Sequence, residues 1–139
     1  MVNGAWRRAL VALGAVLVVT TAAHPQALGQ LAALAGLQPG RWELRELDNP
    51  RAVPRSICIG DTGMLLQLQH RDLPCSRLVL ANEARSATVH YTCPSGGFGR
   101  TSLRVDTSRT VVVDTQGIDD NRPFQYRAEL RRIGSCASR

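Results

Sequence analysis

Cys58 and Cys75 enclose a segment of the chain that carries His70 and Asp72 shortly before the second cysteine. These residue types can bind zinc, and two cysteines can also form a redox centre or a disulfide. Structural zinc sites and thioredoxin-type centres both draw on cysteines spaced as Cys-x2-Cys, and no two cysteines here are that close. We therefore predict no metal site, no redox centre and no bound cofactor. His70 and Asp72 are then predicted to be surface residues of a loop.

Two structural disulfides explain the cysteines best. The chain has four cysteines, namely Cys58, Cys75, Cys93 and Cys136. Four cysteines allow three pairings, and their spacing alone does not choose among them. We expect Cys58–Cys75, which would close the segment between them onto a sheet. We expect Cys93–Cys136, which would tie the last strand to the middle of the chain.

No residue pattern in the chain indicates catalysis. His90 lies between two threonines, on the polar face of a predicted strand. No serine stands in a Gly-x-Ser-x-Gly turn, and the glycine-rich residues 96–100 lack the Lys-Ser/Thr of a phosphate-binding loop. We assign no catalytic residue. A hydrolase that uses His70 or His90 remains the least favoured of three hypotheses.

The N-terminus resembles a secretory signal peptide. Arg7 and Arg8 precede an uncharged apolar run from Ala9 to Val19, and small residues follow it. The uncharged run ends near residue 23, so it is shorter than the roughly 20 residues that span a bilayer, although a retained anchor is the alternative. We predict cleavage between residues 22 and 29, with residues 1–23 as the signal, and a periplasmic mature chain without a transmembrane segment.

The charge of the chain is positive but dispersed. The formal net charge is +6, and removal of Arg7 and Arg8 leaves about +4. All seventeen basic residues are arginine, and acidic residues stand between them, as in residues 41–46. The chain has neither a basic run nor an aromatic series on which bases could stack. We predict no binding of nucleic acid.

Most of the chain after residue 37 alternates apolar and polar residues, which is typical of half-buried strands. In the clearest case Phe124, Tyr126, Ala128 and Leu130 alternate with polar and charged residues. About seven short strands joined by local turns predict an antiparallel meander that curls into a barrel or half-barrel.

One segment of the predicted domain has helical rather than alternating spacing. Met64, Leu65 and Leu68 share one helix face, and Asp61 or Thr62 is a suitable N-cap. We predict one short helix over residues 62–69, which would cover an open end of the curled sheet.

The domain boundaries follow from these patterns. Residues 24–36 are predicted to be a flexible leader or a short helix, residues 37–136 a single β-domain, and residues 137–139 a tail. The turn after the strand near residue 115 is predicted to be loose, over residues 117–123.

Four features in order resemble the domain of unknown function 3617 family, exported proteins of Gram-negative bacteria. Residues 37–43 read Leu-Gln-Pro-Gly-Arg-Trp-Glu, similar to the family's opening, and Cys58 leads into a short helix. Cys93 follows an alternating strand, and the domain closes with Arg-Ile-Gly-Ser-Cys at residues 132–136. The resemblance covers residues 37–136 and implies an exported β-domain, with no activity and no site residues to carry over.

Three functions are compatible with these features. The first is a non-enzymatic binding module for a small or apolar ligand, because barrel mouths commonly hold such ligands. Trp42, Met64 and Leu68 are the candidate ligand contacts, although core packing is the principal interpretation of Trp42. The second is an envelope protein–protein interaction module that uses an edge strand or the arginine-rich face. The third is the hydrolase named above.

Overall fold

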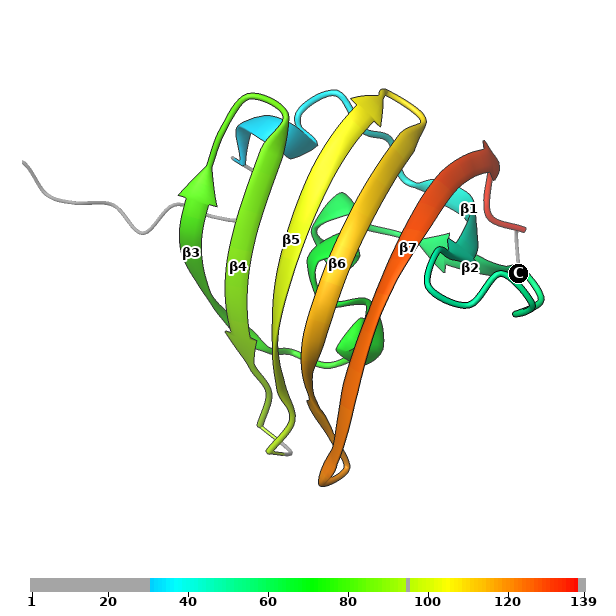
Figure 1. Cartoon of the computed structure of the whole chain (residues 1–139). Helices are drawn as coiled ribbons and strands as arrows, with labels where there is room; N and C mark the ends of the chain where they lie inside the picture. The colour runs from blue at the N-terminus through cyan, green and yellow to red at the C-terminus, as the bar shows by residue number, and fades with distance from the viewer. Residues whose placement is uncertain (1–30, 95, 138–139) are drawn as a thin grey trace, which may run out of the picture.

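A computed structural model describes residues 31–94 and 96–137 of the chain. Within these residues, seven strands form one antiparallel sheet (Figure 1). They are β1 (Gly40–Glu46), β2 (Arg55–Ile59), β3 (Ser76–Asn82), β4 (Ser86–Thr92), β5 (Phe98–Thr107), β6 (Thr110–Asp119) and β7 (Arg122–Gly134). The mainly β fold with about seven strands is confirmed. The predicted signal peptide and the last two residues of the predicted tail lie outside the described residues.

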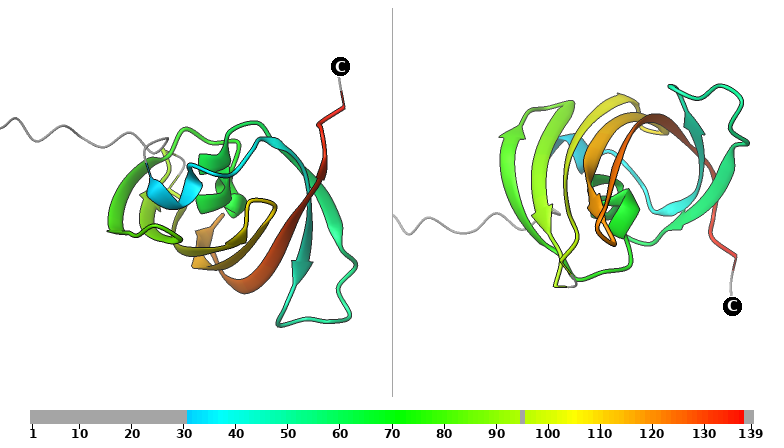
Figure 2. Two further views of the ribbon diagram at one scale, coloured as in Figure 1. Left: turned by 90° about the horizontal axis from the view of Figure 1, so that it is seen from above. Right: turned by 60° about the horizontal axis from the view of Figure 1, so that its bottom comes forward.

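The strand order is β2-β1-β7-β6-β5-β4-β3, and every neighbouring pair is antiparallel. Strands β3 to β7 follow one another as a local meander, as predicted. The β1–β2 hairpin does not lie next to β3 but pairs with β7 on the other side of the sheet. Strands β2 and β3 are therefore both edges, and the curled sheet is a half-barrel that does not close (Figure 2).

The long hairpin of β6 and β7 ends in a tight turn. Asp119 pairs with Arg122, and the two residues between them, Asp120 and Asn121, have φ angles of 48° and 60°. Two positive φ angles are the mark of a type I′ turn, which suits the twist of antiparallel strands. The predicted loose turn over residues 117–123 is therefore wrong, because β6 ends at Asp119, β7 begins at Arg122, and only two residues connect them.

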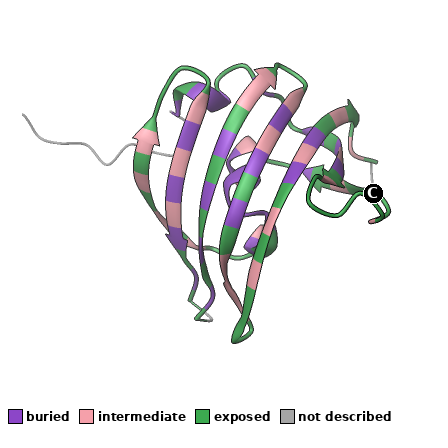
Figure 3. Ribbon diagram, viewed as in Figure 1, coloured by how far each residue is buried: buried purple, intermediate pink, exposed green. Residues whose placement is uncertain are grey.

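The alternation in the sequence separates the two faces of the sheet. In β6, Val111, Val113 and Thr115 are buried on the concave face, whereas Asp114 and Gln116 are exposed on the outer face. Bands of buried and exposed residues alternate along the neighbouring strands in the same way (Figure 3). The period of two arises because successive side chains of a strand point to opposite faces.

Two short 3-10 helices lie on the concave side of the sheet, η3 (Thr62–Leu66) and η4 (Leu68–His70). They belong to the connection from β2 to β3, which crosses from one edge of the sheet to the other (Figure 2). The Asp61 side chain accepts a hydrogen bond of 2.6 Å from the Gly63 amide, as expected for an N-cap. The predicted single helix is corrected to two, because the backbone at Gln67 (φ −143°, ψ 45°) leaves the helical region.

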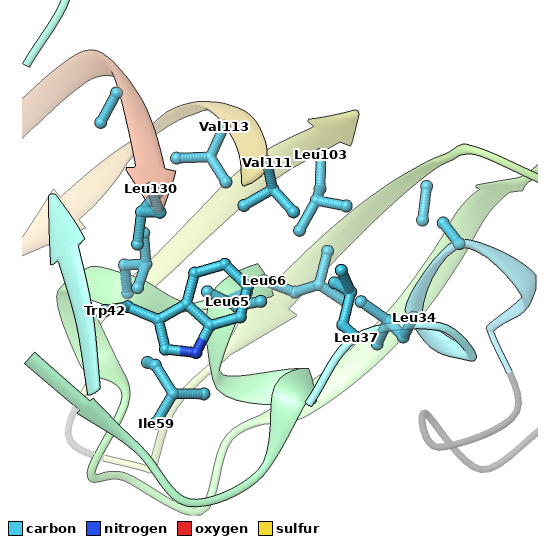
Figure 4. Packing of buried hydrophobic residues seen from close by; sticks show 14 of the residues in the cluster. Leu34, Leu37, Trp42, Ile59, Leu65, Leu66, Leu103, Val111, Val113 and Leu130 are labelled. Carbon is cyan, nitrogen blue, oxygen red and sulfur yellow. The ribbon is translucent and has the colours of Figure 1, made fainter. Parts of the chain in front are cut away.

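The hydrophobic core lies between the concave face and these helices. Trp42 from β1 is at its centre, with Ile59 from β2 and Leu65 and Leu66 from η3 around it (Figure 4). Leucine and valine side chains from β5, β6 and β7 complete this cluster: Leu103, Val111, Val113 and Leu130. Each such side chain contributes about 1.5–3 kcal/mol when it is fully buried, so this cluster is a principal source of the stability.

The packed chain begins earlier than predicted. A third 3-10 helix, η2 (Ala32–Leu34), lies on the concave side near the upper end of β4 and β5 (Figure 1). Leu31, Leu34 and Leu37 are buried in the core. Of the two alternatives predicted for this segment, the structure has the short helix, and its leucines cover core side chains that the half-barrel leaves open.

Both disulfides are present, but the predicted pairing is wrong. Cys58 pairs with Cys136, and Cys75 pairs with Cys93. Cys75 and Cys93 flank the paired residues Ser76 and Thr92 of β3 and β4, so the strand register places them opposite each other. β1 pairs with both β2 and β7, so Cys58 and the chain end after β7 meet at one end of β1.

None of the helices in the described part of the chain has the length and apolar character needed to cross a membrane.

Candidate functional site

A groove of about 640 Å³ lies on the outer face of the sheet, near the end where the β6–β7 hairpin turns. Four strands build it, each with one or more outward-facing side chains. Its lining consists of His90, Phe98, Arg100, Gln116, Gly117, Ile118, Pro123, Phe124 and Gln125. The volume is within the range of about 300–1,000 Å³ that is usual for small-molecule sites.

The strand register arranges one polar row across the groove. His90 pairs with Arg100, Arg100 with Gln116, and Gln116 with Gln125. These four residues come from β4, β5, β6 and β7 in turn and alternate along their strands with residues that face the concave side. The row therefore spans three strand spacings, or about 14 Å.

An apolar row lies beside the polar one. Phe98 pairs with Ile118, and Ile118 pairs with Pro123. Each is two residues along its strand from a member of the polar row, a distance of about 7 Å on the same face. The Phe98 side chain is 41% exposed, so this aromatic ring is accessible to a molecule in the groove. The groove therefore offers an apolar wall and a polar wall.

A glycine allows β5 and β6 to approach closely at the floor of the groove. Gly117 pairs with Gly99 between the two rows and lines the groove. A β-carbon at Gly117 would collide with the carbonyl oxygen of Phe98. Any side chain at this position would therefore push β5 and β6 apart, so glycine is required for the close approach of the two strands.

On the concave side of the same region, a polar cluster surrounds the buried His70 and extends to the half-exposed Asp119. His70 Nδ1 is 3.1 Å from the Tyr91 hydroxyl, and His70 Nε2 is 3.3 Å from Asp119 Oδ1. The Asp119 carboxylate also accepts a hydrogen bond of 2.6 Å from Gln69. Phe124 packs its ring 5.9 Å from that of His70, so the cluster and the groove share one aromatic side chain.

The prediction that His70 is a surface residue is wrong, since it is only 4% exposed. From η4, the His70 ring points toward Tyr91. It occupies space that any side chain at position 97 would need, so glycine at this position makes room for it. Asp72, by contrast, is exposed as predicted. An imidazole between a phenol and a carboxylate is able to relay protons, but Tyr91 is fully buried and His70 nearly so. The contacts indicate that His70 holds η4 against the sheet.

The two histidines considered for catalysis lie on opposite faces of the sheet. His90 faces the outer groove, whereas His70 is buried on the concave side against Tyr91, the residue after His90. Among the residues described, no group of three or more histidine, cysteine, aspartate or glutamate side chains is placed to hold a metal ion.

The three predicted ligand contacts lie together on the concave side, away from the groove. Trp42 is 0% exposed and Leu68 is buried, which supports the packing interpretation of Trp42. Met64 is half-buried and packs against the core. Leu68 lines a second pocket of only about 110 Å³, which is below the usual range for a ligand.

The groove residues were missed because their sequence context predicts turns. Phe98 stands within a glycine-rich segment, and Ile118 and Pro123 lie in the stretch predicted to be a loose turn. Of the lining residues, His90 is a rejected catalytic candidate, and Phe98 and Arg100 belong to the glycine-rich segment that does not fit a phosphate-binding loop. One feature of the sequence does point to the groove. Large apolar residues stand among the turn-forming residues of both segments, and a turn that is exposed to water does not need them.

Burial raises the pKa of Tyr91 and that of Tyr126, because it disfavours the phenolate. In the unfolded chain tyrosine loses its proton near pH 10, so above this pH the folded state binds more protons than the unfolded state. The free energy of unfolding is therefore expected to fall as the pH rises above about 10.

The substitution Tyr91→Phe is expected to reduce this alkaline loss, although it removes the contact with His70 and lowers stability at pH 8. Urea unfolding of both proteins between pH 8 and 11 measures the two slopes. Parallel curves would contradict the assignment of the alkaline loss to Tyr91.

No protein-family model matches this chain, and neither a curated protein nor a solved structure shows significant similarity to it.

Proposed function

We propose that this protein is a non-enzymatic binding module that holds a small ligand with an apolar body in the outer groove. The groove itself carries this proposal. Phe98, Ile118 and Pro123 form an apolar wall on the outer face of the sheet, in a hollow of about 640 Å³. Exposed apolar groups that gather in a concave site commonly mark a place where a ligand or partner removes them from water.

We further propose that the chain is exported to the periplasm and belongs to the domain of unknown function 3617 family. The signal-like residues 1–23 and the family-like motifs support this part of the proposal. The two disulfides are compatible with an oxidising compartment, where such bonds persist.

The substitution Phe98→Ser tests the groove as the binding site. The neutral fluorescent probe N-phenyl-1-naphthylamine is expected to bind the oxidised protein saturably, with enhanced emission. Loss of the Phe98 ring is expected to weaken its affinity about tenfold, which corresponds to about 1.4 kcal/mol of lost apolar contact. Fluorescence titration measures both affinities, and native mass spectrometry of protein purified from periplasm tests for a bound natural ligand.

Leu80→Ser is the matched control for this experiment. Leu80 lies at the register shift of β3, is 48% exposed against 41% for Phe98, and does not line the groove. The control is expected to bind the probe as the original protein does. Equal losses in the two variants would place binding outside the groove, and the absence of saturable binding together with the absence of an adduct would contradict the proposed function.

A second candidate is an envelope protein–protein interaction module that uses β3. This edge strand carries two exposed leucines, Leu78 at 62% and Leu80 at 48%. Edge strands offer unpaired backbone groups to which a strand of another protein can add. Crosslinking from β3 to one defined partner in periplasmic extracts, with an empty groove in native mass spectra, would favour this candidate over the first.

A further inference from the structure

The groove has one charged side chain that no carboxylate among the described residues neutralises. Arg100 is exposed at the middle of the polar row and has no ion pair with any described residue. No aspartate or glutamate is among the residues that line the groove. A ligand that enters it therefore meets a positive charge without a competing negative one.

Some arginines of the sheet have a carboxylate partner and others have none. Four lie within ion-pair distance of a carboxylate: Arg45 with Glu43, Arg55 with Glu46, Arg104 with Asp106 and Arg127 with Asp114. Several others on β1, β3 and β7 lack an ion pair with any described residue, as Arg100 does, but they do not line the groove. The outer face of β5 thus presents Arg104 with an internal partner and Arg100, four residues away, with none. The contrast within one strand indicates that Arg100 is available to a ligand from outside.

The neighbours of Arg100 can add hydrogen bonds to an anion that binds its guanidinium. Gln116 is directly opposite Arg100 on β6 and carries an amide that donates hydrogen bonds. His90 is directly opposite on β4 and adds a ring nitrogen. A guanidinium binds planar carboxylates through two parallel N–H donors. A single arginine matches one negative charge, which favours a carboxylate over a phosphate monoester with nearly two.

The apolar row indicates that the part of the ligand beyond its charged group is apolar. Phe98 and Ile118 lie about 7 Å from the polar row on the same face, so a head group at Arg100 leaves an attached apolar body against them. A neutral apolar molecule can contact the apolar row but gives the Arg100 guanidinium no anionic partner, so it is expected to bind more weakly than an acid with the same apolar body. A strongly polar anion would leave the apolar row exposed.

We propose that the ligand of the groove is an amphipathic monocarboxylate, with its carboxylate on Arg100 and its apolar body on Phe98, Ile118 and Pro123. This inference rests on the proposed binding function and adds the chemical class of the ligand. Arg100 is the specificity-determining residue, because it distinguishes an acid from its ester.

Decanoate and methyl decanoate test this assignment, because they share the apolar body and differ in charge. Calorimetric titration of the oxidised protein below the micellar concentration is expected to show at least tenfold tighter binding of decanoate. In the variant Arg100→Gln, decanoate is expected to bind no more tightly than the ester. The matched control Arg104→Gln, on the same strand and outside the groove, is expected to keep the preference for the acid.

The outcomes separate this inference from the proposed function. Equal affinities for acid and ester in the original protein, or an acid preference that survives Arg100→Gln, would overturn the carboxylate assignment while the groove remains a binding site. Binding of N-phenyl-1-naphthylamine without binding of decanoate would also overturn it. If none of the three compounds binds, the proposed function fails and the assignment fails with it.

Discussion

Replacement of Cys58 and Cys136 by serine in one double variant is expected to lower the free energy of unfolding by about 4.5 kcal/mol. The two cysteines are 78 residues apart in sequence, so their bond removes a large loop entropy from the unfolded chain. Domains of this size have a net stability of about 5–15 kcal/mol, so this loss would leave the fold marginal.

The Cys75–Cys93 disulfide is the internal comparison. It closes a sequence separation of only 18 residues, so the corresponding double serine variant is expected to lose about 3 kcal/mol. Denaturant unfolding of the oxidised proteins, followed by circular dichroism, measures both losses. A larger loss for the Cys75–Cys93 variant would contradict the dependence on loop length.

The Cys58–Cys136 bond also holds an edge of the sheet. β2 has a single strand neighbour, β1, and the bond ties it to the chain end after β7. Hydrogen exchange of the β2 amides is therefore expected to accelerate in the Cys58–Cys136 variant before exchange at β5 and β6 does, since local opening starts where fewest contacts hold a strand.

Trp42→Ala is expected to lower the free energy of unfolding by about 3–5 kcal/mol. The side chain is 0% exposed and fills the space between β2 and η3, where Ile59, Leu65 and Leu66 surround it. Alanine would leave a cavity between β2 and η3, and both elements would have to move to fill it. Thermal and denaturant unfolding measure the loss.

Trp42→Phe is the control for this substitution. The indole Nε1 of Trp42 has no hydrogen-bond partner among the described residues, and an unpaired buried donor is costly. Phenylalanine keeps most of the apolar volume and removes this donor, so its loss is expected to be less than half of that for alanine. Equal losses for the two variants would show that the indole N–H, or a contact specific to indole, matters more than the buried volume.

The sequence alone determined the strands and which of their residues are buried. Val111 and Val113 face the core and Asp114 faces solvent because side chains of a strand alternate by a local steric rule. The same rule predicted the hairpins and the curled antiparallel sheet, and the absence of closely spaced cysteine pairs predicted disulfides. Each of these inferences depends on residues that are near one another in the chain.

The position of β1, the disulfide pairing and the burial of His70 depended on tertiary structure. Nothing near Cys58 in the sequence indicates that β1 will pair with β7, yet this pairing brings Cys136 to it. The packing of His70 against Tyr91 likewise requires η4 to cross the concave face. Contacts between distant segments are selected by how all the side chains of the sheet pack together, and no local period carries that information.

The candidate site shows the same division. Local alternation explains why Arg100 and Gln116 face outward, and composition alone already showed that the arginines are dispersed. The groove exists only because the register of four strands sets Phe98 opposite Ile118 and Arg100 opposite Gln116, with Gly117 between them. Register is set by the turns and the packed face of the whole sheet, so only the tertiary structure could bring these residues into one site.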